Sequence, residues 1–228
     1  ELVTTNYGFI GIGSSANPLK GNFDGNGHTL YNIFSNNGMN SSEGLFTHVT
    51  ATNDIEIKNL KIVGGRLLNA AYNIGIISNI DGIGNVTIEN FTIELDEING
   101  GGCQGGIISE IASQAKVNIS NCKANNKIET GSGTMGGIIG KITGSTDVNI
   151  KDCINYTNIT KGGYAGGILE SCSSNLNIEN CTNNGNISEC TSSVGGIIRA
   201  SSGAEVKLLN CTNNGTITKA GYAGGILE

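Results

Sequence analysis

A four-residue segment, Gly-Gly-Ile-Ile, recurs along this chain of 228 residues. It occupies residues 136–139, with close copies at 105–108, 166–169, 195–198 and 224–227 and degenerate copies at 44–46 and 75–77. The last glycine of each copy stands at position 44, 75, 106, 137, 167, 196 or 225, so consecutive copies are 29 to 31 residues apart. A period this regular predicts a repeat architecture, in which each unit packs mainly on its neighbours.

Each repeat also contains two apolar residues separated by one position, which predicts a short strand because strand side chains alternate between faces. The pairs are Ile55 and Ile57, Val86 and Ile88, Val117 and Ile119, Val148 and Ile150, Leu176 and Ile178, and Val206 and Leu208. A second short strand and the Gly-Gly-Ile-Ile strand complete the repeat. Three short strands per repeat predict an all-β fold, a right-handed single-stranded parallel β-helix (solenoid) of about seven coils. A leucine-rich repeat is rejected, because leucine is sparse and paired glycines disfavour a helix.

Residues 1–50 depart from the repeat, and we expect them to form an atypical initial or capping coil. Their Asp24-Gly25-Asn26-Gly27 segment is a tight-turn signal, and we prefer this interpretation to a calcium loop. Residues 51–228 are expected to form the repeat coils of the same β-helix. The last repeat ends on a strand that has no successor in this sequence, and unpaired strand edges pair readily with other chains. We therefore expect further repeats or a cap in the same polypeptide, with self-association through open coil ends as an alternative.

Two columns of equivalent residues follow the apolar pairs. The first is expected at a bend, because Asn tolerates the left-handed conformation, with its amides facing inward and hydrogen-bonded from coil to coil. Its members are Asn59, Asn90, Asn121, Asp152, Asn180 and Asn210. The second column is expected to contain free, inward-facing thiols that act as small core residues. Its members are Cys122, Cys153, Cys181 and Cys211.

Two neighbouring aliphatic columns belong to the Gly-Gly-Ile-Ile strand, and a regular strand would turn them to opposite faces. The paired glycines make a bend easy, so we expect a bend that buries both columns. The alternative is that one column forms an outward stripe and a possible partner surface. That column contains Leu45, Ile76, Ile107, Ile138, Ile168, Ile197 and Ile226.

Composition narrows the classes of function. The formal net charge is −6 and the Lys and Arg residues are scattered, so a nucleic-acid partner is not expected. No apolar run is long enough to predict a membrane span in this segment.

The acidic and histidine residues do not form a catalytic or metal-binding pattern. Outward positions place no carboxylate beside another on the next coil, and Asp54 and Asp147 share a register three coils apart. His28 and His48 have no partners at metal-ligand spacing, and the acidic group Glu94, Asp96, Glu97 and Glu129 is interpreted as a solvated turn rather than a weak cation site. We expect no cofactor, no metal and no catalytic residue.

The opening of the chain resembles the GLUG-motif repeat proteins. The resemblance rests on residues 8–13 (Gly-Phe-Ile-Gly-Ile-Gly), 23–30 (Phe-Asp-Gly-Asn-Gly-His-Thr-Leu) and 44–46 (Gly-Leu-Phe), and the repeat extends it over nearly the whole chain. The final small residue of the motif survives mainly as Gly140. The resemblance implies a bacterial surface or adhesin-like β-helix, also found as a non-catalytic module beside immunoglobulin-cleaving metalloproteases.

The first functional expectation is a structural or adhesive module of a secreted or cell-surface bacterial protein, acting without catalysis as a rigid stalk or binding surface. Its partner would be a host or matrix protein or a glycan. One alternative is a carbohydrate-active β-helix, either a lyase-like or hydrolase-like enzyme or a glycan-binding region. Another is a filament or assembly subunit that stacks end to end.

Overall fold

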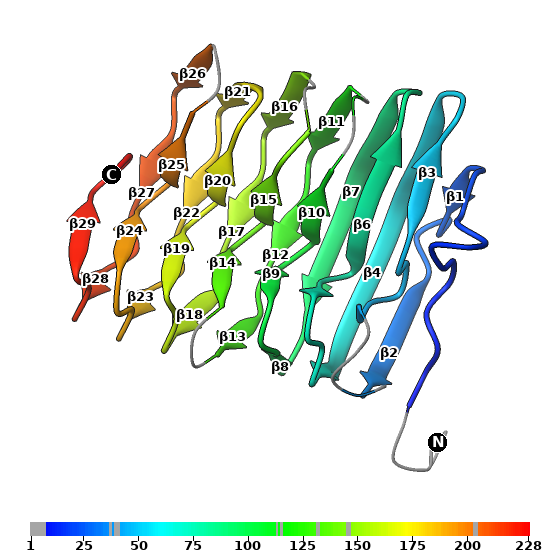
Figure 1. The fold of residues 1–228 in the computed structure, drawn as a ribbon, viewed down its shortest axis with the longest axis horizontal. Coiled ribbons are helices and arrows are strands. Elements are labelled where there is room, and N and C mark those ends of the chain that lie inside the picture. Colours follow the sequence, from blue (N-terminus) through cyan, green and yellow to red (C-terminus); the bar gives the residue numbers. More distant parts are fainter. Residues whose placement is uncertain are drawn as a thin grey trace.

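The computed structural model describes residues 8–36, 38, 42–112, 114, 116–130, 133–144, 147–202 and 205–228. Every regular element in these ranges is a strand, and the strands stack as a parallel β-solenoid of six turns and a partial seventh (Figure 1). The expected all-β parallel solenoid is therefore confirmed. Within the described ranges, the structure contains no helix of a length and apolarity suited to crossing a membrane.

The strands form three parallel sheets, which we name A, B and C. Sheet A contains β1 (Phe23–Asp24), β2 (Thr29–Ser35), β4 (Ile55–Leu68), β7 (Val86–Glu94), β8 (Glu97–Asn99), β11 (Val117–Ser120), β12 (Lys123–Ala124), β13 (Lys127–Glu129), β16 (Asp147–Lys151), β17 (Ile154–Asn155), β18 (Asn158–Thr160), β21 (Asn175–Glu179), β22 (Thr182–Asn183), β23 (Ile187–Ser188), β26 (Val206–Leu209), β27 (Thr212–Asn213) and β28 (Ile217–Thr218). Sheet B contains β3 (Val49–Ala51), β6 (Ile77–Gly82), β10 (Ile108–Ile111), β15 (Ile139–Ile142), β20 (Leu169–Cys172) and β25 (Ile198–Ser201). Sheet C contains β5 (Asn73–Ile74), β9 (Cys103–Gly105), β14 (Thr134–Gly136), β19 (Tyr164–Gly166), β24 (Ser193–Gly195) and β29 (Tyr222–Gly224).

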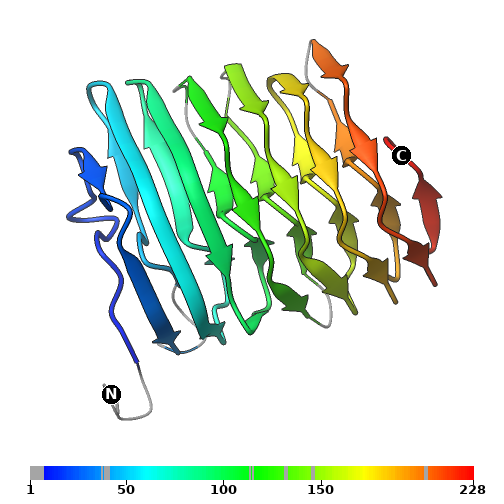
Figure 2. The same ribbon diagram turned by 180° about the vertical axis from the view of Figure 1, so that it is seen from behind.

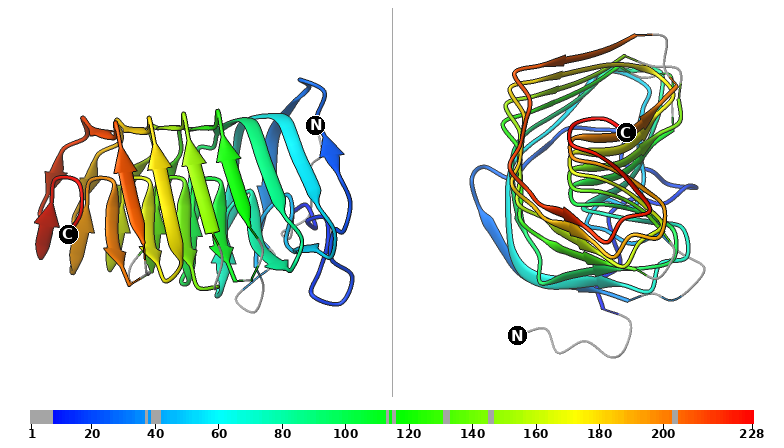
Figure 3. Two further views of the ribbon diagram at one scale, coloured as in Figure 1. Left: turned by 90° about the horizontal axis from the view of Figure 1, so that it is seen from above. Right: turned by 90° about the vertical axis from the view of Figure 1, so that its left-hand side faces the viewer.

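From the second to the sixth, each coil passes through sheet A, then sheet C, then sheet B, and the next coil begins again in sheet A. The fourth coil, for example, contains β11 to β13, then β14, then β15. Viewed along the long axis, successive coils lie almost on top of one another (Figure 3). The broad face made by sheet A is visible from behind (Figure 2). The register matches the predicted repeat, because Val117 pairs with Val148 and Ile119 with Ile150.

The first coil belongs to the same stack. Strands β1 and β2 pair in parallel with β4, and β3 pairs with β6. The expected turn is present between β1 and β2, where Asn26 has a φ of 49° and its backbone N–H donates to Asp24 Oδ1 at 2.8 Å. Residues 1–7 lie outside the described residues. The capping role of the first coil stays a prediction.

The Gly-Gly-Ile-Ile segment turns the corner between sheets C and B. Strand β9 ends at Gly105 and β10 begins at Ile108, so the bend falls on Gly106 and Ile107. Both aliphatic columns are buried along the stack, which confirms the expected bend. The alternative partner surface is wrong for the column of Leu45, Ile76, Ile107, Ile138, Ile168, Ile197 and Ile226, because all but the last lie in the core. Ile226 is 39% exposed since it belongs to the partial last coil.

The second glycine of the segment is required by a close approach to the following coil, as at Gly137. A Cβ added at Gly137 would lie 2.1 Å from the carbonyl oxygen of Gly167 and 2.3 Å from Nδ2 of Asn155. The same two kinds of neighbour surround Gly167 and Gly196. The recurrence of glycine here therefore follows from a backbone-to-backbone contact that leaves no room for a side chain.

We predict that Gly137→Ala lowers the free energy of unfolding by about 2 kcal/mol or more, because the methyl group overlaps main-chain atoms of the next coil. Gly225→Ala is the matched control, since a Cβ at that equivalent position in the last coil meets no atom within 4 Å. Urea titration of both variants measures the difference. Equal stability losses would contradict the contact.

Candidate functional site

The predicted asparagine column lies at a bend, as expected, but it faces outward. All six members have φ between 52° and 57°, the left-handed region that Asn and Asp tolerate. Their side chains are hydrogen-bonded between coils: Asn90 Nδ2 donates to Asn59 Oδ1 at 3.0 Å, and Asn210 Nδ2 to Asn180 Oδ1 at 3.1 Å. Asp152 takes part through a 3.0 Å hydrogen bond from Asn180 Nδ2. The expectation that the amides face inward is wrong, because Asn59 is half-buried and the other five members are exposed.

A second asparagine ladder, which the sequence reasoning missed, is buried in the core. Asn155 Nδ2 donates to Asn183 Oδ1 at 2.7 Å, and Asn183 Nδ2 donates to Asn213 Oδ1 at 2.9 Å. The oxygen of Asn155 also accepts from the backbone N–H of Thr157 at 2.9 Å. A signal was present, since each of these residues follows a ladder cysteine by two positions. Strand alternation places residues two apart on the same face.

The cysteine column is buried, as predicted. Cys122, Cys153 and Cys181 lie in the core, Cys211 is half-buried in the last coil, and all four are free thiols. Each thiol donates to the carbonyl oxygen two residues earlier, for example from Cys153 Sγ to Lys151 O at 3.2 Å. The column therefore behaves as a stack of small core residues whose weak donors are satisfied locally.

Two of these thiols, Cys153 and Cys181, are held in the neutral form by a raised pKa. The hydrogen bond with the Cys122 thiol, followed by burial, raises the pKa of Cys153, and the hydrogen bond with Cys153 raises the pKa of Cys181. Burial raises the pKa of Cys103, in sheet C, to about 12. Because the thiolate is the nucleophile and the metal ligand, these cysteines are poor candidates for either role. Among the described residues, no group of three or more His, Cys, Asp or Glu side chains is placed to hold a metal ion.

The other titratable residues singled out in the sequence lie in separate contacts. Asp96 Oδ2 accepts from the backbone N–H of Gly65 at 2.9 Å, while Glu129 is bound by Lys161 at 2.6 Å and Lys127 at 3.0 Å. The hydrogen bond from Lys161 lowers the pKa of Glu129. His48 Nε2 lies 3.0 Å from Asp81 Oδ2. The acidic group of the sequence is thus divided among local partners rather than gathered at one point.

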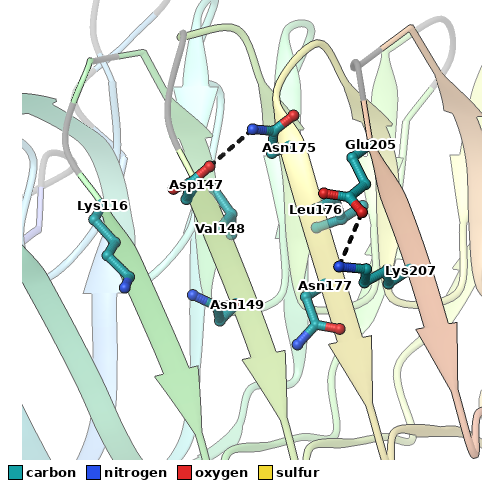
Figure 4. A pocket seen from close by; sticks show the side chains of 9 residues that line it. All are labelled: Lys116, Asp147, Val148, Asn149, Asn175, Leu176, Asn177, Glu205 and Lys207. Atoms are coloured by element: carbon teal, nitrogen blue, oxygen red, sulfur yellow. Dashed lines mark hydrogen bonds and ion pairs between the residues drawn. The ribbon is translucent and has the colours of Figure 1, made fainter.

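The outer face of sheet A carries a shallow polar hollow of about 290 Å³ over β16, β21 and β26 (Figure 4). Asp147, Asn175 and Glu205 occupy one register column, so Asp147 and Glu205 are two coils apart. Asn175 Nδ2 donates to Asp147 Oδ1 at 3.0 Å, and Lys207 lies 2.9 Å from Glu205. The sequence reasoning paired Asp147 with the distant Asp54 and missed Glu205, which lies nearer in the same column.

We predict that Asn183→Ala costs about 1–3 kcal/mol of stability, because it leaves Asn155 Nδ2 and the backbone N–H of Gly185 without their acceptor inside the core. Asn184→Ala is the matched control, since it removes the neighbouring outward hydrogen bond from Asn214 at 2.9 Å. Thermal denaturation of both variants compares them. The buried ladder would lose its assigned role if Asn184→Ala were the more damaging change.

The raised pKa of Cys103 predicts lower stability in alkali. The thiol is neutral in the folded state up to about pH 12, whereas in the unfolded chain it ionises near its ordinary pKa of 9.0. The contribution of this neutral thiol to the free energy of unfolding is therefore fully present below pH 9. As the pH rises, this contribution is lost, by about 1.4 kcal/mol between pH 8 and pH 10. Urea titrations at both pH values should show this loss in the parent chain, and Cys103→Ala should lack that part of it. An identical loss in the variant would contradict the assignment.

Comparison with known proteins supports the fold. No protein-family model matches the chain, and no curated protein matches it. A solved structure described as a "putative immunoglobulin A1 protease" from Bacteroides ovatus aligns with 89% of this chain and 68% of its own, at a TM-score of 0.55 and 21% identity. At this identity, the likeness concerns the fold alone.

Proposed function

We propose that this chain is a non-catalytic structural module, a rigid stalk or binding surface of a secreted or cell-surface bacterial protein. The observation that carries the proposal is that outward polar side chains are joined from coil to coil. The asparagine ladder at the outer bend is one such row. A second row of ion pairs includes Lys161 with Glu129 and Lys219 with Glu189, at 2.6 Å and 2.9 Å.

These rows are suited to fixing the register of the stack rather than to chemistry. Exposed ion pairs contribute little free energy individually. A side chain engaged with the next coil also has less hydrogen-bonding capacity left for a substrate. Together with parallel strand pairing through every coil, the rows favour a stiff rod whose coils keep one register.

The surface location and the partner are parts of the same proposal. The GLUG resemblance of the sequence favours a bacterial surface protein, and the solenoid neighbour with a protease description fits a module that accompanies a separate catalytic region. A host or matrix protein or a glycan is the proposed partner. Screening the purified chain for binding to immobilised matrix proteins and glycans identifies this partner.

A second candidate is carbohydrate processing in the hollow of sheet A. Asp147 and Glu205 are two strand spacings apart, about 9.6 Å, close to the upper separation of the two carboxyl groups of inverting glycosidases. Each is already paired with a neighbour, Asn175 or Lys207, and for this reason we favour the structural role. Release of reducing ends from a polysaccharide by the purified chain, abolished by Asp147→Asn, would reverse this preference.

Rigidity provides the direct test of the structural role. Residual dipolar couplings of backbone amides in the second and sixth coils are expected to fit one alignment tensor, because the intervening coils are continuously paired. The same sample should leave immunoglobulin A and polysaccharides intact after prolonged incubation. Two independent tensors, or cleavage of either class of substrate by the chain, would contradict the proposal.

A further inference from the structure

Equivalent positions in successive coils occupy the same place in the fold, so a residue of one coil can be compared directly with its counterparts in the other coils. Two columns face each other across the corner between sheets C and B, as shown by hydrogen bonds that Cys103 and Ser109 exchange at 3.3 and 2.8 Å. The sheet C column is Asn73, Cys103, Thr134, Tyr164, Ser193 and Tyr222. The sheet B column is Thr47, Ser78, Ser109, Gly140, Glu170 and Arg199. From the fifth coil onward, the sheet C column thus carries the aromatic residues Tyr164 and Tyr222, and the sheet B column carries the charged residues Glu170 and Arg199.

The charged pair at this corner is firmly anchored. Glu170 is only 1% exposed, and its Oε1 accepts hydrogen bonds from Nε of Arg199 at 3.0 Å and from Nη2. Its other oxygen accepts from the hydroxyl of Ser171. Burying a carboxylate is costly even when it is paired, and Gly140 and Ser109 show that the fold does not need a charge at this position. The charge at this corner is therefore a local feature of the fifth and sixth coils and not a requirement of the repeat.

The anchored guanidinium lies over an exposed aromatic ring. The central carbon of Arg199 is 4.6 Å from the ring centroid of Tyr164, within the range of a cation–π contact. Within the described part of the chain, neither Nη1 of Arg199 nor the hydroxyl of Tyr164 has a hydrogen-bond partner. The arrangement fixes the orientation of the ring and leaves polar groups free beside it.

A second ring continues the same column. Tyr222 pairs with Ser193, which stands in the register of Tyr164, so the Cα atoms of the two tyrosines are two strand spacings apart, about 9.6 Å. Tyr164 is 41% exposed and Tyr222 72%. The intervening serine is small and does not obstruct a ligand laid from one ring to the other. This spacing roughly matches two linked hexose rings.

We propose that Tyr164, Ser193 and Tyr222, with Arg199 beside them, bind an oligosaccharide that lies along the solenoid axis. The C–H faces of pyranose rings stack on tyrosine, and sugar hydroxyls accept hydrogen bonds from a guanidinium and exchange them with serine. Arg199, held by Glu170, fixes Tyr164 in position and donates through Nη1. This site rests on the proposed role of the chain as a binding surface, and it specifies oligosaccharides as the ligand class.

Tyrosine-selective NMR tests the site in the intact chain. The chain has six tyrosines, so ring-labelled protein gives a small, assignable set of signals. The probes are hexasaccharides of β-linked glucose, β-linked xylose, β-linked N-acetylglucosamine and α-linked galacturonate. At least one is expected to shift the Tyr164 and Tyr222 signals and to leave those of Tyr31 and Tyr72 in place. If none of the four shifts both signals at millimolar concentration, the proposal is wrong.

Variants separate stacking from a general surface effect. Tyr164→Ala and Tyr222→Ala are each expected to weaken the hexasaccharide about tenfold or more, while Tyr164→Phe retains most of the affinity because it keeps the ring. Tyr72→Ala is the matched control, since Tyr72 is also exposed, at 61%, but lies outside this column. Equal weakening by Tyr72→Ala would overturn the site. Failure of the site would leave the rigidity measured by dipolar couplings unaffected, so the two proposals fail separately.

Discussion

The close approach of successive coils at the second glycine of each repeat is the contact on which the rest of the structure depends. At Gly137 the main chain lies against the carbonyl of Gly167 and against the amide of Asn155, so neither a side chain nor a change of register fits. This contact sets the bend between sheets C and B. The bend in turn allows both aliphatic columns to enter the core, which a regular strand would forbid. The buried asparagine ladder runs beside the same glycines and satisfies polar groups that would otherwise be stranded in the core.

Much of this architecture could be predicted from spacing alone. The period indicated the parallel solenoid, alternation indicated the inward strand residues, and the cysteine column was correctly placed in the core. The two errors have physical causes. The outer asparagine column was assigned an inward direction from its capacity to form ladders, although a left-handed residue at a bend turns its side chain away from the strand pattern, as at Asn90. The buried column at Asn155 was missed because polar residues are rarely expected in a core.

The surface was harder to predict, because its features depend on contacts between different sheets. Sequence columns within sheet A could be compared directly, and even there Glu205 was overlooked beside Asp147. The corner between sheets C and B brings together residues from strands that are separated by a bend, such as Tyr164 and Arg199, and no periodicity relates them. Repeats nevertheless make such departures visible once the register is known. A buried position that is serine in one coil and charged in another, as at Ser109 and Glu170, indicates a local requirement that the fold itself does not impose.

The glycine and asparagine contacts at this corner hold the coils together. Native-state amide hydrogen exchange measures this, because a backbone N–H at each of four corner glycines donates to a carbonyl of the following coil at 2.9 to 3.1 Å. These are Gly106, Gly137, Gly167 and Gly196. We expect these amides to exchange among the slowest of the chain and only through opening of the whole stack. Exchange of these glycine amides at the rate of exposed loop amides would contradict it.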